Sequence, residues 1–286
     1  MKGKAETRSD VHVYTPHRAG LPPLREYFRD LWRRRDFAME LANTNMRAAN
    51  TNTALGQLWL VVNPLLLAAV YFLLVVVLRG PRGGEVDFPQ IAGGLFLFFL
   101  ITGIIQACAT SVTNSGSLVL NMNFPKLLLI VSNTYLAVRR YLPTLLVYLV
   151  IHLLWGRPFT VHMLWIPLAI VCASMVGMGI GALVATLQVY FRDTAQFLPY
   201  IIRIWLYASP VLYTAEEFLQ TTIGRHMGRF VQVNPATSVL GIWGDATHAA
   251  TPSLTYIAIA VGWSLLLTIA GSLIFMSRER EFAVRL

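Results

Sequence analysis

The residues best suited to chemistry lie in YFRDTAQFLPYIIRIWLYASPVLY, an apolar run from Tyr190 to Tyr213 that also carries charged residues. Tyr200, Arg203 and Tyr207 stand at i, i+3 and i+7, so on a helix they share one face. A charge near the middle of a membrane span costs roughly 2.5–3.5 kcal/mol, so Arg203 should face water or a partner. Tyrosine rings stack on sugars and a guanidinium binds phosphate or hydroxyl groups, so this face suits sugar and phosphate. The alternative is an arginine that is satisfied between packed helices.

Patterns for an energy-converting or catalytic centre are absent from the sequence. There is no GxxxxGK[ST] phosphate loop, no HExxH, no acidic pair able to hold a catalytic metal, and no pair of histidines at metal-ligand spacing. The fourteen acidic residues lie in predicted loops, tails or the leader, which leaves no candidates for an intramembrane proton relay. If the protein drives uphill transport, the energy must come from a partner at its cytoplasmic face.

The composition sets the environment of these residues. Of the 286 residues, 56% are hydrophobic and 13% are charged, which indicates a membrane protein. A bilayer core of roughly 30 Å needs about 20 apolar residues as helix, and no strand alternation is visible, so we predict an all-α protein. Six spans are expected: Leu58 to Leu78, Ile91 to Ala109, about Ser132 to Trp155, Met163 to Gln188, Phe197 to Tyr213, and Leu254 to Met276.

Positive charge predicts the orientation. Seventeen of the 23 Lys and Arg residues fall on the side of the amino-terminal leader, and five fall on the other side: Arg79, Arg82, Arg157, Arg225 and Arg229. The positive-inside rule therefore places both termini in the cytoplasm. We interpret the net charge of +9 as this bias plus attraction to anionic lipid, not as nucleic-acid binding.

Four segments are expected along the chain. Residues 1–21 form a disordered cytoplasmic tail, 22–57 a cytoplasmic interfacial helix and linker, 58–276 the six-span domain, and 277–286 a cytoplasmic tail. In the second segment the apolar residues repeat at helical spacing, which favours a helix lying in the headgroup layer or against a partner protein. Those residues are Leu24, Tyr27, Phe28, Leu31 and Trp32.

Three further features belong to the six-span domain. A short cytoplasmic helix is expected at about 115–124, between spans two and three. The loop 214–252 holds too many apolar residues for a free aqueous loop and favours an external re-entrant hairpin, whose second helix begins with Asn234 as N-cap and Pro235 at its first position. Gly177 and Gly181 form a GxxxG pair that allows close helix packing.

Several stretches resemble one family when taken in order. LGQLWLVVNPLLLAAVYFLL, FPKLL, VYFRDTAQFLPYIIRIWLYASPVLY, NPAT and the terminal EREFAVRL are similar to segments of the type-2 ABC exporter permeases. The resemblance runs from about residue 24 to 286. YFRD followed by SP resembles the branch that exports lipid-linked polysaccharides, namely O-antigens, teichoic acids and galactan, and the leader looks most like the actinobacterial cell-wall galactan exporter. The family's basic pair before LGxxW is missing, since only Arg47 stands there.

The resemblance implies a function and partners. The chain would be the permease of an exporter in a bacterial plasma membrane, acting as a homodimer with two copies of an ABC ATPase. That partner would bind ATP and Mg, so no cofactor is expected in this chain. The substrate would be a polyprenyl pyrophosphate-linked polysaccharide, carried outward without covalent chemistry in the permease.

The resemblance also suggests site residues. The translocation path would include Tyr200, Arg203, Trp205, Tyr207 and Tyr213. ATPase coupling would involve Ser117, Leu118, Leu120, Asn121, Asn123, Phe124 and Lys126. The external gate would involve Pro210, Glu216, Glu217, Asn234 and Pro235. Arg192 and Asp193 would act in gating or ATPase docking, or simply cap the fifth helix and anchor it.

Arg139 and Arg140 have two interpretations. Tyr141 to Trp155 supplies 15 residues after them, which is about 22 Å of helix. The pair therefore marks the membrane boundary by reaching to headgroups, or recognises the substrate pyrophosphate at the cytoplasmic entrance.

Three rival functions stay open. A type-2 ABC exporter of a small hydrophobic drug or lipid would share the architecture. A membrane-embedded glycosyl- or acyltransferase would need an acidic or histidine pair at a membrane face, which the sequence does not offer. A scaffold subunit would associate with partners without stimulating an ATPase.

Overall fold

The computed structural model describes residues 20–48, 55–79, 87–212 and 233–286, and within these ranges the regular structure is entirely helical. Two of the helices are short 3-10 turns. The elements are α1 (Leu24–Arg33), α2 (Arg35–Ala48), η1 (Gly56–Leu58), α3 (Trp59–Arg79), α4 (Phe88–Ala109), α5 (Ser111–Asn114), α6 (Gly116–Asn121), α7 (Leu127–Leu154), η2 (Val161–Trp165), α8 (Ile166–Tyr190), α9 (Thr194–Tyr207), α12 (Pro235–Thr247) and α13 (Leu254–Arg285).

Five helical segments are long and apolar enough to cross a membrane, which makes the chain a multi-pass membrane protein. They are Gly56–Val77, Phe88–Ala109, Leu127–Leu154, Val161–Tyr190 and Leu254–Arg285. The predicted fifth span, Phe197 to Tyr213, is not among them. Its helix α9 has 14 residues, about 21 Å at 1.5 Å per residue, and ends at Tyr207 before Pro210. The proline has no amide hydrogen to continue the helix.

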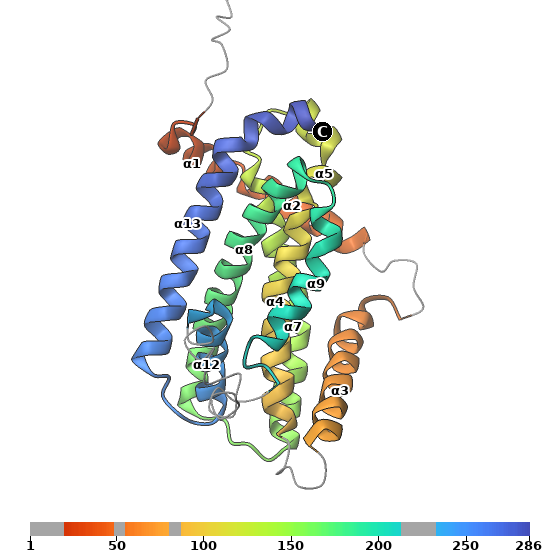
Figure 1. Ribbon diagram of the computed structural model, residues 1–286, viewed down its shortest axis with the longest axis vertical. Helices are drawn as coiled ribbons and strands as arrows, with labels where there is room; N and C mark the ends of the chain where they lie inside the picture. The colour runs from red at the N-terminus through yellow and green to blue at the C-terminus, as the bar shows by residue number, and fades with distance from the viewer. Residues whose placement is uncertain (1–19, 49–54, 80–86, 213–232) are drawn as a thin grey trace, which may run out of the picture.

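Helix α4 forms the centre of the bundle (Figure 1). Its buried residues occupy every face, including Phe96, Phe98 and Ile101, and it has no separate polar stripe. Helices α3, α7, α8, α9 and α12 all pack on it. A helix that is apolar on all sides must be surrounded by other apolar surfaces, and here protein supplies them.

Glycines allow the tightest helix contacts. A Cβ on Gly177 would lie 2.9 Å from the carbonyl oxygen of Ile101, and one on Gly181 would lie 2.8 Å from Cβ of Cys108. The predicted GxxxG packing is therefore confirmed, with α4 as the partner helix. A closer pair joins α8 to α13, because a Cβ on Gly271 would lie 2.2 Å from the carbonyl oxygen of Gly179.

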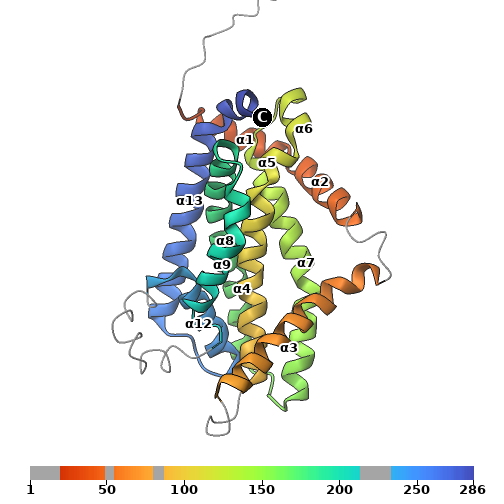
Figure 2. The ribbon, with the colours of Figure 1, turned by 45° about the vertical axis from the view of Figure 1, so that its right-hand side comes forward.

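The bundle has two distinct ends (Figures 1 and 2). Helices α1, α2, α5 and α6 and the last turns of α13 gather at one end, called here the leader end. Helix α12 and the first turn of α4 lie at the opposite end, called the α12 end. This grouping agrees with the expectation that the leader helix, the 115–124 segment and the C-terminal residues share one side.

Some predicted features lie outside the described residues. They are the tail up to residue 19, Arg82, the first half of the predicted hairpin (214–232), and the path and gate residues Tyr213, Glu216 and Glu217. Helix α12 lies in the second half of the predicted hairpin segment and begins at the predicted position.

Candidate functional site

The predicted tyrosine–arginine face lies on the outside of the chain. Tyr200 and Tyr207 are 67% and 48% exposed, and Arg203 between them is also exposed. Tyr71 of α3 lies within electrostatic range of Arg203 and Tyr207, so α3 and α9 present these groups on the same side of α4. The exposed surface thus combines aromatic rings with the Arg203 guanidinium beside apolar helices. Such a charge favours contact with water or with a polar group of another molecule over contact with lipid.

Trp205 lies on a different face of α9. Its indole N–H donates to Oδ1 of Asn234 at 2.9 Å, and its ring meets Phe98 edge-on at 5.3 Å. Asn234 also donates to Oγ of Ser209 at 2.8 Å. The same Oδ1 atom accepts from the amide of Ala236 at 3.0 Å, which confirms the predicted N-cap. Trp205 therefore joins α9 to α12.

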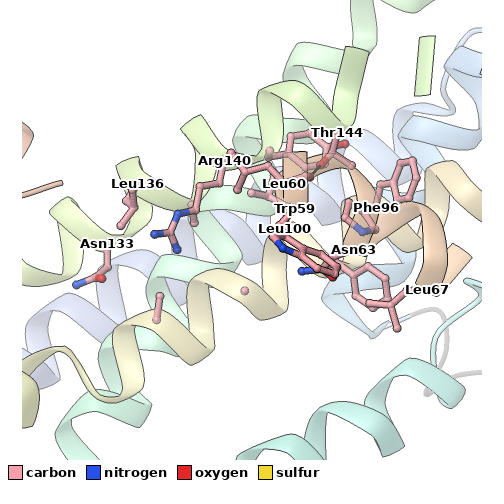
Figure 3. A pocket seen from close by; sticks show the side chains of 16 residues that line it. Trp59, Leu60, Asn63, Leu67, Phe96, Leu100, Asn133, Leu136, Arg140 and Thr144 are labelled. Carbon is pink, nitrogen blue, oxygen red and sulfur yellow. Dashed lines mark hydrogen bonds between the residues drawn. The ribbon is translucent and has the colours of Figure 1, made fainter. Parts of the chain in front are cut away.

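A pocket of about 350 Å³ opens between α3, α4 and α7 (Figure 3). Its lining is mainly apolar, with Asn133 and Arg140 at one end and Asn63 and Thr144 farther along. The lining residues are Trp59, Leu60, Asn63, Pro64, Leu67, Phe96, Phe99, Leu100, Gly103, Ala107, Asn133, Leu136, Ala137, Arg140, Tyr141 and Thr144. The volume lies within the range of roughly 300–1,000 Å³ that is usual for small-molecule sites.

Arg139 and Arg140 face different surroundings, although they are adjacent in sequence. Arg139 donates to Oδ1 of Asn43 on α2 and lies 5.7 Å from the ring of Tyr135. Arg140 lines the pocket instead. Successive residues of a helix point about 100° apart, so one binding group cannot readily engage both. Of the pair, only Arg140 is available to a ligand in the pocket.

Arg140 has no hydrogen bond or ion pair with the described part of the chain. A charged arginine at the centre of a membrane span costs roughly 2.5–3.5 kcal/mol even on the lenient insertion scale, and Arg140 is the fourteenth of the 28 residues of α7. That cost falls when an anion pairs with the guanidinium. The pocket therefore offers a charged site that the described protein groups leave unpaired.

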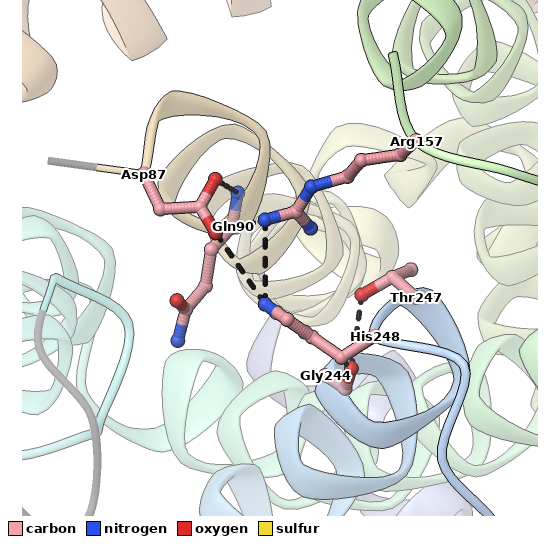
Figure 4. A network of polar contacts seen from close by, with 6 residues as sticks. All are labelled: Asp87, Gln90, Arg157, Gly244, Thr247 and His248. Carbon is pink, nitrogen blue, oxygen red and sulfur yellow. Dashed lines mark hydrogen bonds and ion pairs between the residues drawn. The ribbon is translucent and has the colours of Figure 1, made fainter. Parts of the chain in front are cut away.

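A polar network holds the α12 end together (Figure 4). Asp87 caps α4 by accepting from the amide of Gln90 at 3.3 Å, and Arg157 donates to the same carboxylate. Nε2 of His248, at the end of α12, lies 3.4 Å from Asp87 and 3.3 Å from Arg157. The three side chains thus connect α4, the loop after α7, and α12.

Charge interactions shift the acidities in this network. The hydrogen bond with Asp87 raises the pKa of His248 above its ordinary value, although burial opposes the shift. For Asp87, burial alone would raise the pKa, but the contacts with His248 and Arg157 outweigh it and lower the pKa. The network therefore favours a charged carboxylate and a protonated imidazole. Sequence reasoning missed it, because Asp87 and His248 are 161 positions apart.

The predicted coupling residues lie at the leader end. Ser117, Leu120, Asn121 and Asn123 are exposed, while Leu118 and Lys126 are half-buried. Phe124 is different, because it is buried and packs against Phe37 of α2 at 5.6 Å.

The predicted coupling segment is anchored to the leader. Arg34, between α1 and α2, donates to the carbonyl of Asn123 at 2.8 Å. Tyr27 of α1 donates to Glu279 of α13 at 2.6 Å and accepts from the amide of Leu127 at 3.3 Å. A movement of this segment would therefore reach α1, α7 and α13.

Arg192 and Asp193 stand between α8 and α9. Both are exposed, and Arg192 donates to the carbonyl of the last residue, Leu286, at 3.4 Å. Asp193 occupies the N-cap position of α9 without a side-chain capping bond. Tyr190 donates to Glu281 just before this turn. The YFRD stretch is thus tied to the last turns of α13.

The fold and these surfaces define a multi-pass helical membrane protein that presents a polar, aromatic face on α9, beside its apolar helices. The chain belongs to the ABC-2 type transporter family, whose model matches residues 39–240. It is 27% identical over 259 residues to the O-antigen export system permease protein RfbA of Klebsiella pneumoniae, covering 87% of this chain and 94% of the relative. It is 25% identical over 260 residues to the RfbA permease of Myxococcus xanthus, covering 89% and 97%.

Proposed function

We propose that this chain is the permease subunit of an ATP-driven exporter that moves a polyprenyl pyrophosphate-linked polysaccharide out of the cytoplasm across a bacterial plasma membrane. Family membership and the O-antigen export named for its relatives support this function. The observation that carries it is the exposed face of Tyr200, Arg203 and Tyr207. Tyrosines suit sugar rings, and the guanidinium suits phosphate or hydroxyl groups.

The working unit would contain two copies of this chain and two ABC ATPase subunits. The exposed faces of α3 and α9 would meet the second copy and enclose the path. The leader end would face the cytoplasm, in line with the positive charge there. The ATPases would bind the exposed residues around α6 and the surface of α1, and would supply ATP and Mg. The permease would thus need no catalytic centre of its own.

A six-span topology is part of this proposal. Helix α9 and the residues after it would form the fifth span, and α12 would be the second arm of the external re-entrant hairpin. Asn234 and Pro235 support this gate, because they fix the start of α12 against α9. Galactan as cargo, with a role in cell-wall assembly, is the most specific form of the proposal.

The second candidate is a type-2 exporter of a small hydrophobic drug or lipid. The mainly apolar pocket between α3, α4 and α7 favours it, because the volume suits an amphiphile. The two functions differ in where the cargo binds. A polysaccharide would engage the tyrosine–arginine face, whereas a drug or lipid would engage the pocket.

ATP hydrolysis by the complex tests the choice. The permease is co-purified with its ATPase in lipid nanodiscs and measured with polyprenyl pyrophosphate-linked glycan or with free lipid. We expect stimulation by the glycan and not by the lipid. Arg203→Ala should abolish most of the stimulation, and Arg203→Lys should retain part of it, because lysine keeps the charge but not the bidentate geometry. Stimulation that survives Arg203→Ala in a folded complex would refute the role of this face.

A further inference from the structure

The pocket between α3, α4 and α7 carries its charged group at one end. Asn133 and Arg140 of α7 lie at one end, whereas Leu67 and Phe96 lie at the other (Figure 3). Asn63 of α3 lies between the two ends. This gradient matches a molecule with a polar head and a hydrocarbon chain.

The polar end carries a positive charge that the protein does not neutralise. Arg140 is half-buried, and no carboxylate lies among the residues that line the pocket. Asn133 points its side chain toward the same end, although its amide donates to the carbonyl of Leu129 at 2.8 Å. An anion is therefore the matching head group, and phosphate, the anionic group of membrane phospholipids, can accept both N–H bonds of the guanidinium fork.

We propose that this pocket binds the phosphate group of a membrane lipid, with Arg140 pairing with the phosphate and the lipid chain lying against Leu67, Phe96 and Phe99. Trp59, at the start of α3, borders the same space. Helix α3 exposes most of its side chains in the single chain, so the pocket is open to a lipid beside α3, either from the bilayer or from the path that α3 and α9 would enclose with the second copy.

The phosphate has two possible sources. One is an anionic phospholipid of the surrounding membrane, which would hold α3 against α4 and α7. The other is the polyprenyl pyrophosphate carrier of the glycan, and only this second source rests on the proposed function. Both share the phosphate chemistry and a long hydrocarbon chain.

Lipid binding to the full-length permease, measured in a neutral detergent by native mass spectrometry, tests the site. The probes are dioleoylphosphatidylglycerol, undecaprenyl pyrophosphate, neutral dioleoylglycerol and inorganic pyrophosphate. We expect Arg140→Gln to weaken binding of at least one phosphate-bearing lipid by about tenfold or more, the scale of one lost charge-assisted pair. Arg140→Lys should restore part of the affinity.

The neighbouring arginine provides the matched control. Arg139→Gln removes the same charge one residue away but breaks a bond to Asn43 outside the pocket, so binding should change by no more than about twofold. Gly103→Leu fills part of the pocket without touching Arg140, because Gly103 lines the pocket and nothing stands within 4 Å of an added Cβ there, so it should weaken lipid binding while the protein stays folded. It keeps the test decisive if Arg140→Gln does not fold.

Each outcome decides the proposal. Arg140-dependent binding of phosphatidylglycerol supports the membrane-phospholipid source, and Arg140-dependent binding of undecaprenyl pyrophosphate supports the carrier. Equal binding by wild type and Arg140→Gln, equal loss in Arg139→Gln, or equal binding of inorganic pyrophosphate without a chain would overturn it. The assay needs neither ATPase nor glycan. A permease that fails here but shows glycan-stimulated ATP hydrolysis therefore refutes the pocket alone.

Discussion

The hydroxyl of Tyr27 donates a hydrogen bond to the carboxylate of Glu279 at 2.6 Å and joins α1 to α13 across 252 positions of the chain. The same oxygen accepts from the amide of Leu127, at the start of α7. Burial, followed by the nearby carboxylate, raises the pKa of the Tyr27 hydroxyl, so it remains a donor at any physiological pH. Three elements of the leader end thus meet at one atom.

Tyr27→Phe should destabilise the protein. The change keeps the ring and removes only the hydroxyl, which leaves Glu279 without its donor. A hydrogen bond to a charged group contributes about 1.5–3 kcal/mol, so the thermal unfolding temperature of the detergent-solubilised chain should fall clearly. Tyr135→Phe is the control, because no hydrogen bond of its hydroxyl is found among the described residues. Equal effects of the two changes would show that the Glu279 contact contributes nothing.

Gly179→Ala should be among the most damaging small substitutions in the membrane region. Its Cβ would lie 2.3 Å from the carbonyl carbon of Leu267, so α8 and α13 would have to separate. Overpacking of this kind costs about 1–3 kcal/mol or more. We expect a lower unfolding temperature or a loss of folded protein in fluorescence-detected size-exclusion chromatography.

Gly262→Ala gives the matched control for that experiment. Gly262 lies inside α13, and nothing stands within 4 Å of its added Cβ. Alanine is favoured over glycine inside a helix by about 0.5–1 kcal/mol, so this variant should be as stable as the wild type or slightly more so. A similar loss in both variants would mean that the cost comes from replacing any helix glycine and not from the contact with α13.

Local sequence patterns predicted some of these contacts and missed others. The GxxxG spacing of Gly177 and Gly181 is visible within one helix, and the N-cap at Asn234 follows from the residue types around it. The approach of Gly179 to Gly271 could not be predicted, because it depends on how two distant helices are aligned. Patterns within one helix can be recognised in the sequence. The alignment of two helices depends on how their side chains pack, which the sequence of either helix alone does not show.

The candidate site shows the same division. Helical spacing correctly placed Tyr200, Arg203 and Tyr207 on one exposed face of α9. Hydropathy alone extended that span to Tyr213, but the helix ends at Tyr207. Adjacency in sequence suggested one role for Arg139 and Arg140, but the turn of the helix directs only Arg140 into the pocket. A hydropathy scan averages polarity along the chain, so it shows neither where a helix ends nor the direction in which each side chain points.

Stability at the α12 end should depend on pH through Asp87 and His248. The pKa of His248 is raised above 6.5, so its contribution is complete below pH 6.5 and is lost as the pH rises through its folded-state pKa. The pKa of Asp87 is lowered below 3.8, so its contribution is complete above pH 3.8 and is lost as the pH falls through its folded-state pKa. Arg157 opposes protonation of His248. His152 and Asp245 also lie within the electrostatic range of His248. The network is therefore strongest between these two pH values.

His248→Gln tests this dependence. The side chain is 41% exposed, so screening limits the effect to about 1 kcal/mol or less. The unfolding temperature of the variant should fall below that of the wild type at about pH 5.5, and the difference should shrink at about pH 8. His162→Gln is the control, because its ring contacts Thr251 and the substitution leaves the Asp87–His248 pair in place. A difference between wild type and His248→Gln that is equal at both pH values would rule out the charged pair.

Asn234 should be the residue on which the joint between α9 and α12 depends most. Its Oδ1 atom accepts from both Trp205 and the amide of Ala236, and its amide donates to Ser209. Asn234→Ala removes an N-cap, worth about 0.5–2 kcal/mol, and leaves the Trp205 N–H unpaired at about 1–3 kcal/mol. The unfolding temperature should therefore drop strongly.

Asn234→Asp separates these contributions. Aspartate keeps the acceptor for Trp205 and for the cap, and loses the donors to Ser209 and to the carbonyl of Ala208, so it should retain most of the stability that Asn234→Ala loses. Ser209→Ala removes the contact with Asn234 from the other side, together with the bond from Ser209 to the carbonyl of Trp205, and should also cost less than Asn234→Ala. If Asn234→Asp is as unstable as Asn234→Ala, the donors to Ser209 and Ala208 and not the cap hold the joint, because the aspartate still satisfies both acceptor contacts.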